Sequence, residues 1–226
     1  MNAESLTAGG KGSPTPGQSG HPMAMFAVVV TALMMSALDS TIVATALHAL
    51  QGGLRASITL VGWTITAYSL GRVLVLPLAG KLTVRYGPRR VFLVSVSIFT
   101  AASLCCGLAG SIYVLVALRL VQAVGGAGFT PTATKIVVDH FGPSRDKAVG
   151  IFGSAFTTGA LIGPLLGGVI VALWSWRGVF LVNVPIGLAL IPLCLRYVPA
   201  DGPRHAQPGR HLDVPGIGLL GAGLLA

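Results

Sequence analysis

Long, uninterrupted apolar stretches dominate this sequence and predict its secondary structure. A helix needs about 20 apolar residues to cross the hydrocarbon core of a bilayer. Stretches of at least that length run over residues 24–47, 57–79, 91–134, 148–173 and 178–198. The third stretch is long enough for two helices, and the small residues Gly107, Gly110 and Ser111 indicate a turn between them. The pattern therefore predicts an all-α membrane protein with a six-helix bundle.

Polar segments flank the six predicted spans. Residues 1–22 are rich in Gly, Ser, Pro and Thr and predict a disordered tail. Residues 23–198 contain the transmembrane bundle, and the prolines and glycines of residues 199–212 predict a linker. A further apolar segment covers residues 213–226, which is too short for a complete crossing. We interpret that segment as a truncated seventh helix.

Composition and charge exclude most other classes of protein. The chain is 53% hydrophobic and 9% charged, whereas about a quarter of the residues of a soluble domain are charged. The net charge of +9 does not indicate a nucleic-acid partner, because the basic residues lie in short gaps between apolar runs. Membrane lipids are the expected partners. The three cysteines lie inside apolar runs and the five histidines are scattered, so we expect no catalytic residues, no metal site, no cofactor and no enzyme activity.

The distribution of Lys and Arg predicts the orientation of the chain in a cell membrane. Positively charged loops are retained in the cytoplasm. The opposite gaps contain only Arg55 and Arg177. The tail and the gaps after the second, fourth and sixth spans contain Lys11, Lys81, Arg85, Arg89, Arg90, Lys135, Arg145, Lys147, Arg196, Arg204 and Arg210. This asymmetry predicts a cytoplasmic N-terminus. Trp63, Tyr113, Trp174 and Trp176 then lie near the outer ends of the spans, as an interfacial aromatic belt would.

Three charged residues, Asp39, Arg72 and Arg119, fall inside the predicted spans. Charges in a membrane are costly and usually have a function and a partner. Asp39 lies roughly 20 Å from the cytoplasmic end of its helix and Arg119 roughly 10 Å from the outer end of the fourth. Because the hydrocarbon core is about 30 Å thick, these depths are similar. A carboxylate that faces a guanidinium across a cavity could take up and release protons. The alternative is an ion pair that only holds the two helices together.

Two further features have a structural and a functional interpretation. Arg72 lies in the inner part of the second predicted span, where it could line a pore or extend to the cytoplasmic headgroups. The segment GALIGPLLGG at residues 159–168 repeats small residues at four-residue spacing and contains a proline. Such a face allows close packing of helices, and the proline can bend the span.

Five ordered segments carry a resemblance to a known family. The segment GKLTVRYGPRR at residues 80–90 resembles the signature between helices 2 and 3 of the major facilitator superfamily. LRLVQAVGGAGFTP at residues 118–131 resembles its helix 4 motif, and residues 159–168 resemble its helix 5 antiporter motif. LDSTIVATAL at residues 38–47 and WRGVFLVNVPIG at residues 176–187 resemble segments of the fourteen-helix drug:proton antiporters. The resemblance covers residues 24–226 and identifies an N-terminal portion.

The resemblance implies roles for individual residues. Asp39 and Arg119 would serve proton coupling. Val84 stands where the family usually has an aspartate, which predicts a weakened gate, and Arg72 stands where the family has a small or apolar residue. The conformational gate would comprise Gly80, Arg85, Gly87, Arg89 and Arg90. The bend between the two halves of the transporter would comprise Gly159, Gly163, Pro164, Gly167 and Gly168.

The leading hypothesis is a multidrug efflux transporter of the kind that confers antibiotic resistance. It would exchange protons for amphipathic, often cationic organic compounds, and its partners would include a missing C-terminal half. Two alternatives remain. One is a metabolite importer or symporter of the same fold, against which the helix 5 motif argues. The other is a truncated fragment that is inactive on its own, because the central site of this fold needs both halves.

Overall fold

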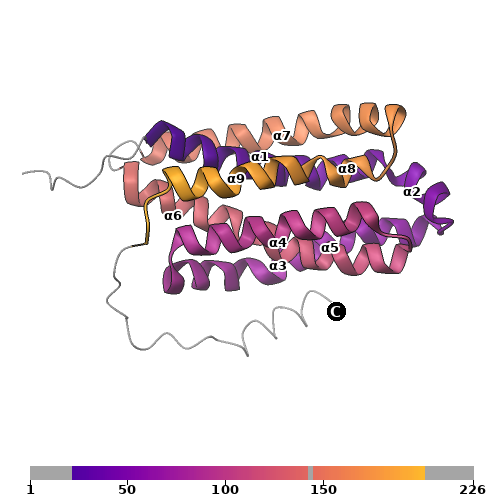
Figure 1. The fold of residues 1–226 in the computed structure, drawn as a ribbon, viewed down its shortest axis with the longest axis horizontal. Coiled ribbons are helices and arrows are strands. Elements are labelled where there is room, and N and C mark those ends of the chain that lie inside the picture. The colour runs from indigo at the N-terminus through magenta and orange to yellow at the C-terminus, as the bar shows by residue number, and fades with distance from the viewer. Residues whose placement is uncertain (1–21, 142–144, 202–226) are drawn as a thin grey trace, which may run out of the picture.

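The computed structural model describes residues 22–141 and 145–201, and in these two segments every regular element is a helix. The helices pack side by side as an elongated bundle (Figure 1). They are α1 (Pro22–Thr45), α2 (Leu47–Leu54), α3 (Ile58–Tyr86), α4 (Pro88–Leu108), α5 (Ile112–Ala127), α6 (Phe129–Phe141), α7 (Arg145–Leu173), α8 (Gly178–Leu181) and α9 (Asn183–Tyr197). The predicted tail before Pro22, the linker beyond Asp201 and the seventh helix lie outside the described residues.

Six spans in the described residues are long and apolar enough to cross a membrane, as the sequence predicts. Four of them consist mainly of α1, α3, α4 and α7. The fourth span covers Ile112–Phe141 and joins α5 to α6 at Gly128, and the sixth covers Gly178–Tyr197 and joins α8 to α9. The predicted turn within residues 91–134 is confirmed, because α4 ends at Leu108 and α5 begins at Ile112.

The second span is longer than the sequence predicts. We expected a helix over residues 57–79 followed by a loop, but α3 continues to Tyr86 and α4 begins at Pro88. Gly87 alone makes the turn, with a φ of 103° that side chains with a Cβ rarely adopt. Pro88 then occupies the first turn of α4, where its missing N–H leaves no helical bond unmade. Most of the predicted gate loop is therefore helical.

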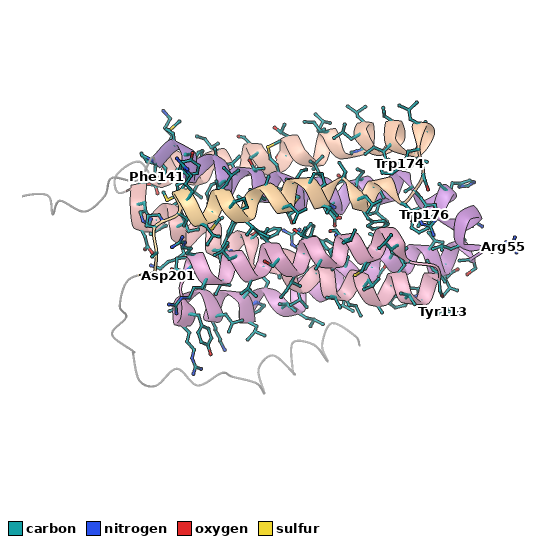
Figure 2. All side chains as sticks on the ribbon, in the orientation of Figure 1. Arg55, Tyr113, Phe141, Trp174, Trp176 and Asp201 are labelled. Atoms are coloured by element: carbon teal, nitrogen blue, oxygen red, sulfur yellow. The ribbon has the colours of Figure 1, made fainter. Side chains whose placement is uncertain are left out.

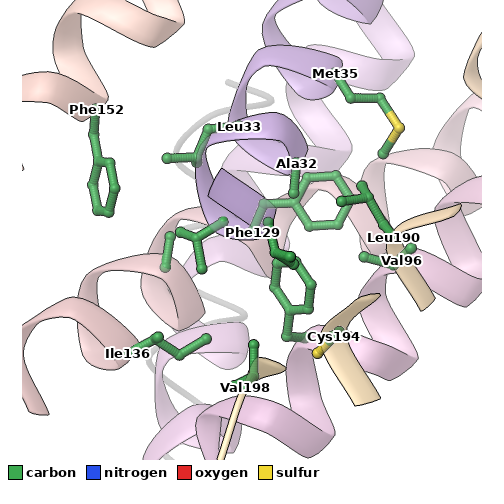
Figure 3. Close-up of a cluster of buried hydrophobic side chains, with 14 of the residues drawn as sticks. Ala32, Leu33, Met35, Val96, Phe129, Ile136, Phe152, Leu190, Cys194 and Val198 are labelled. Carbon is green, nitrogen blue, oxygen red and sulfur yellow. The ribbon is translucent and has the colours of Figure 1, made fainter. Parts of the chain in front are cut away.

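Two clusters of buried apolar side chains fill the bundle, one toward each end. Figure 3 shows part of the first, in which Phe129 of α6 packs on Phe99 of α4 with 5.3 Å between ring centroids. The second lies near α2 and includes Ile42 of α1 and Phe180 of α8. Within a membrane such side chains stabilise the bundle by close packing rather than by removal from water.

The ends of the bundle carry different residues. Figure 2 places Arg55, Tyr113, Trp174 and Trp176 at one end, which we call the Arg55 end, and Asp201 at the other, which we call the Asp201 end. The side chains of Tyr113 and Trp174 are exposed, as the predicted aromatic belt requires. Trp176 lies at the same end, as predicted, but it is buried against Gly53 of α2 and does not contribute to an exposed belt.

Candidate functional site

A layer of polar side chains crosses the bundle between the two apolar clusters. On α1, Met35 belongs to the first cluster and Ile42 to the second, and Asp39 lies between them. Helices α3, α4 and α5 also contribute buried residues to both clusters. The buried side chains of the layer are Asp39 of α1, Ser103 of α4, Arg119 and Gln122 of α5, and Asn183 at the start of α9. We call these five residues the polar cluster.

The Asp39 carboxylate is the centre of the polar cluster. Its Oδ2 accepts a hydrogen bond from Arg119 Nη1 at 2.7 Å. Its Oδ1 accepts hydrogen bonds from Gln122 Nε2 at 2.9 Å and from Asn183 Nδ2 at 2.8 Å. All four side chains are at most 1% exposed. The ionised carboxylate thus has three donors from two other helices.

The Arg119 guanidinium is enclosed as completely as the carboxylate. Its Nη1 also donates to Gln122 Oε1 at 2.6 Å, and its Nε donates to the backbone carbonyl of Thr64 at 3.1 Å. The guanidinium carbon lies 4.1 Å from the ring centroid of Tyr68 and 5.6 Å from that of Phe180. Aromatic faces stabilise a desolvated cation by about 2 kcal/mol. The cation is held by α1, α3, α5 and α8 together.

The hydrogen bonds of the polar cluster enclose the Asp39–Arg119 ion pair. One carboxylate and one guanidinium leave the layer neutral overall, and every polar neighbour of Asp39 is a donor. A buried ion pair offsets its desolvation only when its remaining hydrogen-bonding groups are satisfied, and here they are. A proton on Asp39 would place an O–H among donors, so proton uptake requires these contacts to change.

The sequence predicted only part of this cluster. The pairing of Asp39 with Arg119 is confirmed, but the two groups are in direct contact and no cavity separates them. The sequence analysis missed Gln122, Asn183 and Ser103. The signal was present for the two amides, because both stand within apolar spans inside segments that carry the family resemblance. Ser103 gave no such signal, although its Oγ accepts from Gln122 Nε2 at 2.7 Å.

Arg72 lies apart from the polar cluster. It is one helical turn along α3 from Tyr68, on the side toward the Asp201 end, and its side chain is partly exposed. Its guanidinium carbon lies 5.8 Å from the ring centroid of Phe156 on α7. Within the described residues no ion pair joins Arg72 to a carboxylate.

The predicted gate residues lie at the Asp201 end. Gly80 and Arg85 belong to the last turns of α3, and Arg85 is exposed with its guanidinium 5.4 Å from the ring centroid of Tyr86. Gly87 makes the turn between α3 and α4. Arg89 and Arg90 occupy the first turn of α4, and the Arg89 side chain donates to the backbone carbonyl of Leu195 on α9.

A carboxylate from outside the predicted gate, that of Asp201, lies at the start of α4. Val84, at the position where the family usually has an aspartate, is exposed on α3. The Asp201 carboxylate nevertheless reaches α4, where Oδ1 accepts from the Arg89 backbone N–H at 3.1 Å and Oδ2 from that of Arg90 at 3.0 Å. An anion at a helix N-terminus is stabilised by the unpaired N–H groups and the helix dipole. A residue just after α9 thus caps α4.

Comparison with known proteins identifies the fold and the family. Residues 29–221 match the family profile of the Major Facilitator Superfamily. The chain belongs to the major facilitator superfamily. Members of this superfamily are membrane transporters rather than enzymes, and the six spans make this chain part of a multi-pass membrane protein.

Curated members of the superfamily are similar over most of the chain. The multidrug resistance protein B homolog of Mycobacterium tuberculosis is 34% identical over 221 residues, which are 94% of this chain and 40% of the relative. The tetracenomycin C resistance and export protein of Streptomyces glaucescens is 37% identical over 209 residues, 92% of this chain and 38% of the relative. The chain therefore spans about 40% of the length of these two relatives.

Solved structures of major facilitator proteins share the fold. The inward-open xylose transporter from E. coli superimposes with a TM-score of 0.69 at 16% identity. The match covers 89% of this chain and 56% of the transporter chain. At this identity the comparison bears on the fold alone.

The helix 5 motif of the superfamily lies on α7 and has two faces. Gly159, Gly163 and Gly167 are buried against α1, and a Cβ at Gly163 would clash with Thr41 Oγ1. Pro164 and Gly168 are on the exposed face. Three of the five predicted residues therefore provide close packing between α7 and α1 within this chain, and two face outward.

Proposed function

We propose that the full-length protein containing this chain exchanges protons for small amphipathic drugs or other organic compounds across a cell membrane. The observation that carries this proposal is the buried Asp39 carboxylate, held midway through the bundle by three donors from other helices. A carboxylate is the side chain that takes up one proton and loses its charge in doing so. The printed names of the relatives, which include multidrug resistance and export, support efflux.

Proton uptake would act by loosening the polar cluster. A proton on Asp39 removes the charge that balances Arg119 and leaves a cation in a low-dielectric layer. The guanidinium then favours a state in which water or a substrate anion reaches it. Loss of the proton restores the pair. Because the pair joins α1 to α5, its opening and closing would bias the packing of these helices.

The two amides of the polar cluster would accommodate the proton. An amide presents two donors or, after a half-turn, a carbonyl acceptor. Asn183 donates to Asp39 Oδ1, and reversal of its amide would bring its oxygen to the protonated carboxyl group. Gln122 is less free to reverse, since its oxygen already accepts from Arg119 Nη1. We therefore assign the proton-linked rearrangement to Asn183.

The gate and the bend would convert this rearrangement into alternating access. We propose that the Asp201 end is cytoplasmic, on the basis of the Lys and Arg distribution, and that Gly80, Arg85, Gly87, Arg89 and Arg90 form its gate. The α4 cap by Asp201 links this gate to the end of α9. Motion of the six-helix unit against a second unit would alternately expose the central site. Gly163 and its neighbours on α7 would keep α7 in close contact with α1 during that motion.

A transport assay tests the coupling. The full-length gene product in liposomes should concentrate the lipophilic cation rhodamine 123 against an imposed proton gradient. Asp39→Asn should abolish this uphill movement. Exchange of the dye across the membrane that needs no proton gradient should continue. Asp139→Asn is the control, because Asp139 pairs with Lys135 on the partly exposed surface of α6. Uphill movement that survives Asp39→Asn would exclude the coupling role.

The competing hypotheses have their own tests. Counterflow of labelled sugars, organic acids or amino acids would reveal an importer of the same fold. Drug susceptibility of cells that express residues 1–226 alone, beside cells that express the full-length product, tests whether the six-helix unit is active by itself. We expect no resistance from the 226-residue chain, because the central site of this fold is formed by two halves.

A further inference from the structure

Arg72 lies at the midpoint of α3, in the inner part of its apolar run. It is preceded and followed by 14 residues of that helix, which runs from Ile58 to Tyr86. At a rise of about 1.5 Å per residue, roughly 20 Å of helix separates it from either end. The apolar run of this helix ends near residue 79, about 10 Å beyond Arg72. The Arg72 guanidinium does not extend toward that end, because it lies over the ring of Phe156 on α7.

The described carboxylates leave Arg72 without an ionic partner. Asp39 is bound by Arg119 and two amides, and Asp139 is paired with Lys135. Asp201 caps α4 at the end of the bundle, and Asp146 lies in the first turn of α7. A cation at this depth is costly unless an anion or water reaches it.

The surroundings of Arg72 suit a ligand that carries both an acid and a ring. Its guanidinium lies over the Phe156 ring of α7, whose side chain is 39% exposed. Both α3 and α7 pack on α1, and they are the least buried of the six spans. A partly exposed guanidinium offers paired N–H donors that match a carboxylate. The exposed ring of Phe156 offers an apolar face to the body of the same ligand.

We propose that Arg72 and Phe156 form an anion subsite for the acid group of a transported aromatic compound. The subsite lies one helical turn from Tyr68, whose ring contacts Arg119, so one aromatic residue separates a bound acid from the polar cluster. This inference rests on the proposed function, because it assigns the subsite to a transported compound. It extends the substrate class from amphipathic cations to compounds with a carboxylate.

A matched pair of dyes tests the subsite. Rhodamine 110 carries a free carboxylate, and rhodamine 123 is its methyl ester. Binding of each dye to the full-length gene product in nanodiscs is measured by fluorescence anisotropy. Arg72→Gln should weaken binding of rhodamine 110 about tenfold, the equivalent of one lost charged contact, and should change binding of rhodamine 123 less than about twofold. Arg72→Lys should have an intermediate effect on rhodamine 110, because it keeps the charge and loses the planar fork.

The control is another arginine over a ring. The Arg196 guanidinium lies 5.7 Å from the ring centroid of Tyr197, but it is exposed near the end of α9. Arg196→Gln should leave the binding of both dyes unchanged. If Arg72→Gln fails to fold, the subsite is judged on Arg72→Lys, which retains the cation that the membrane interior has to accommodate.

Each outcome decides for or against the subsite. Selective loss of rhodamine 110 supports it. Equal loss of both dyes overturns it and assigns Arg72 to an ion pair with another part of the protein. No loss of either dye, or binding of the ester alone by the unmodified protein, also overturns it. Proton-driven transport is measured separately, so Arg72-dependent binding without uphill transport would retain the subsite and reject the exchange mechanism.

Discussion

Arg119 and Arg72 are two arginines in the membrane-spanning part of one bundle, and both lie over aromatic rings, but their burial and hydrogen bonding differ. Arg119 is completely buried, hydrogen-bonded to Asp39, Gln122 and the Thr64 carbonyl. Arg72 is partly exposed and its one described partner is the ring of Phe156. The Arg119 side chain thus stabilises the fold, whereas the Arg72 side chain is accessible to a ligand. The presence of a carboxylate partner, rather than depth in the membrane, distinguishes the roles of the two arginines.

The largest effect should follow when Arg119 loses its anion. Asp39→Ala leaves the Arg119 cation buried, which should lower the free energy of unfolding by about 3–5 kcal/mol. The double variant Asp39→Ala and Arg119→Leu should recover much of that loss, because no charge is then left without a partner. SDS titration in mixed micelles measures the free energy of unfolding of the unmodified protein, of each single variant and of the double variant, which together form a double-mutant cycle. Additive losses would mean that the two residues stabilise the bundle independently.

A smaller loss should follow removal of one amide from the polar cluster. Asn183→Ala removes one of three donors to Asp39 and leaves an acceptor less satisfied, which costs about 1–3 kcal/mol. The carboxylate keeps Arg119 and Gln122, so the effect should be smaller than that of Asp39→Ala. The same unfolding assay measures it. A loss as large as that of Asp39→Ala would show that Asn183, rather than the ion pair, holds the cluster together.

The sequence predicted the fold and the central pair because each left a local signal. Five apolar runs, one of them long enough for two helices, give six spans, and a charge inside such a run is costly enough to imply a partner. Gln122 and Asn183 are also polar residues inside apolar runs, but an uncharged amide is far less costly in a membrane, so its presence implied no particular contact. Their joint contact with Asp39 depends on how the helices pack, which one chain's pattern does not give.

The cap on α4 could not be predicted from the sequence, for a different reason. The pattern at residues 80–90 indicated a missing carboxylate at Val84, and it gave no sign that another would replace it. Asp201 lies 112 residues from Arg89 in the chain and reaches it only because the end of α9 packs beside the start of α4. The length of α3 was missed as well, since Lys81 and Arg85 interrupt its apolar run while helical hydrogen bonding continues to Gly87.

Substitution of Asp201 tests whether the loss of a hydrogen-bonded carboxylate costs more stability deep in the bundle than at its end. Its carboxylate, like that of Asp39, accepts several hydrogen bonds, but it lies at the end of the bundle. Asp201→Ala should cost about 0.5–2 kcal/mol, the usual loss for an N-cap, and less than Asp39→Ala. Hydrogen exchange of the first turn of α4 should rise with it. The control is Asp139→Ala, which removes a partly exposed i,i+4 ion pair and should cost about 0.5 kcal/mol or less. Unaltered exchange in α4 would be incompatible with capping by Asp201.

The smallest effect on stability is expected for Arg72. Arg72→Gln removes no hydrogen bond or ion pair among the described residues and loses only a cation–π contact with Phe156 at 5.8 Å. Substitutions of this kind are usually within about 0.5 kcal/mol of neutral, and removal of an unpaired membrane charge works toward stabilisation. Arg119→Gln in the same unfolding assay should instead cost several times more, because it strands the Asp39 carboxylate. If Arg72→Gln destabilised the bundle as much as Arg119→Gln, Arg72 would be a structural residue with a partner outside the described residues, and it could not be free to bind a substrate acid.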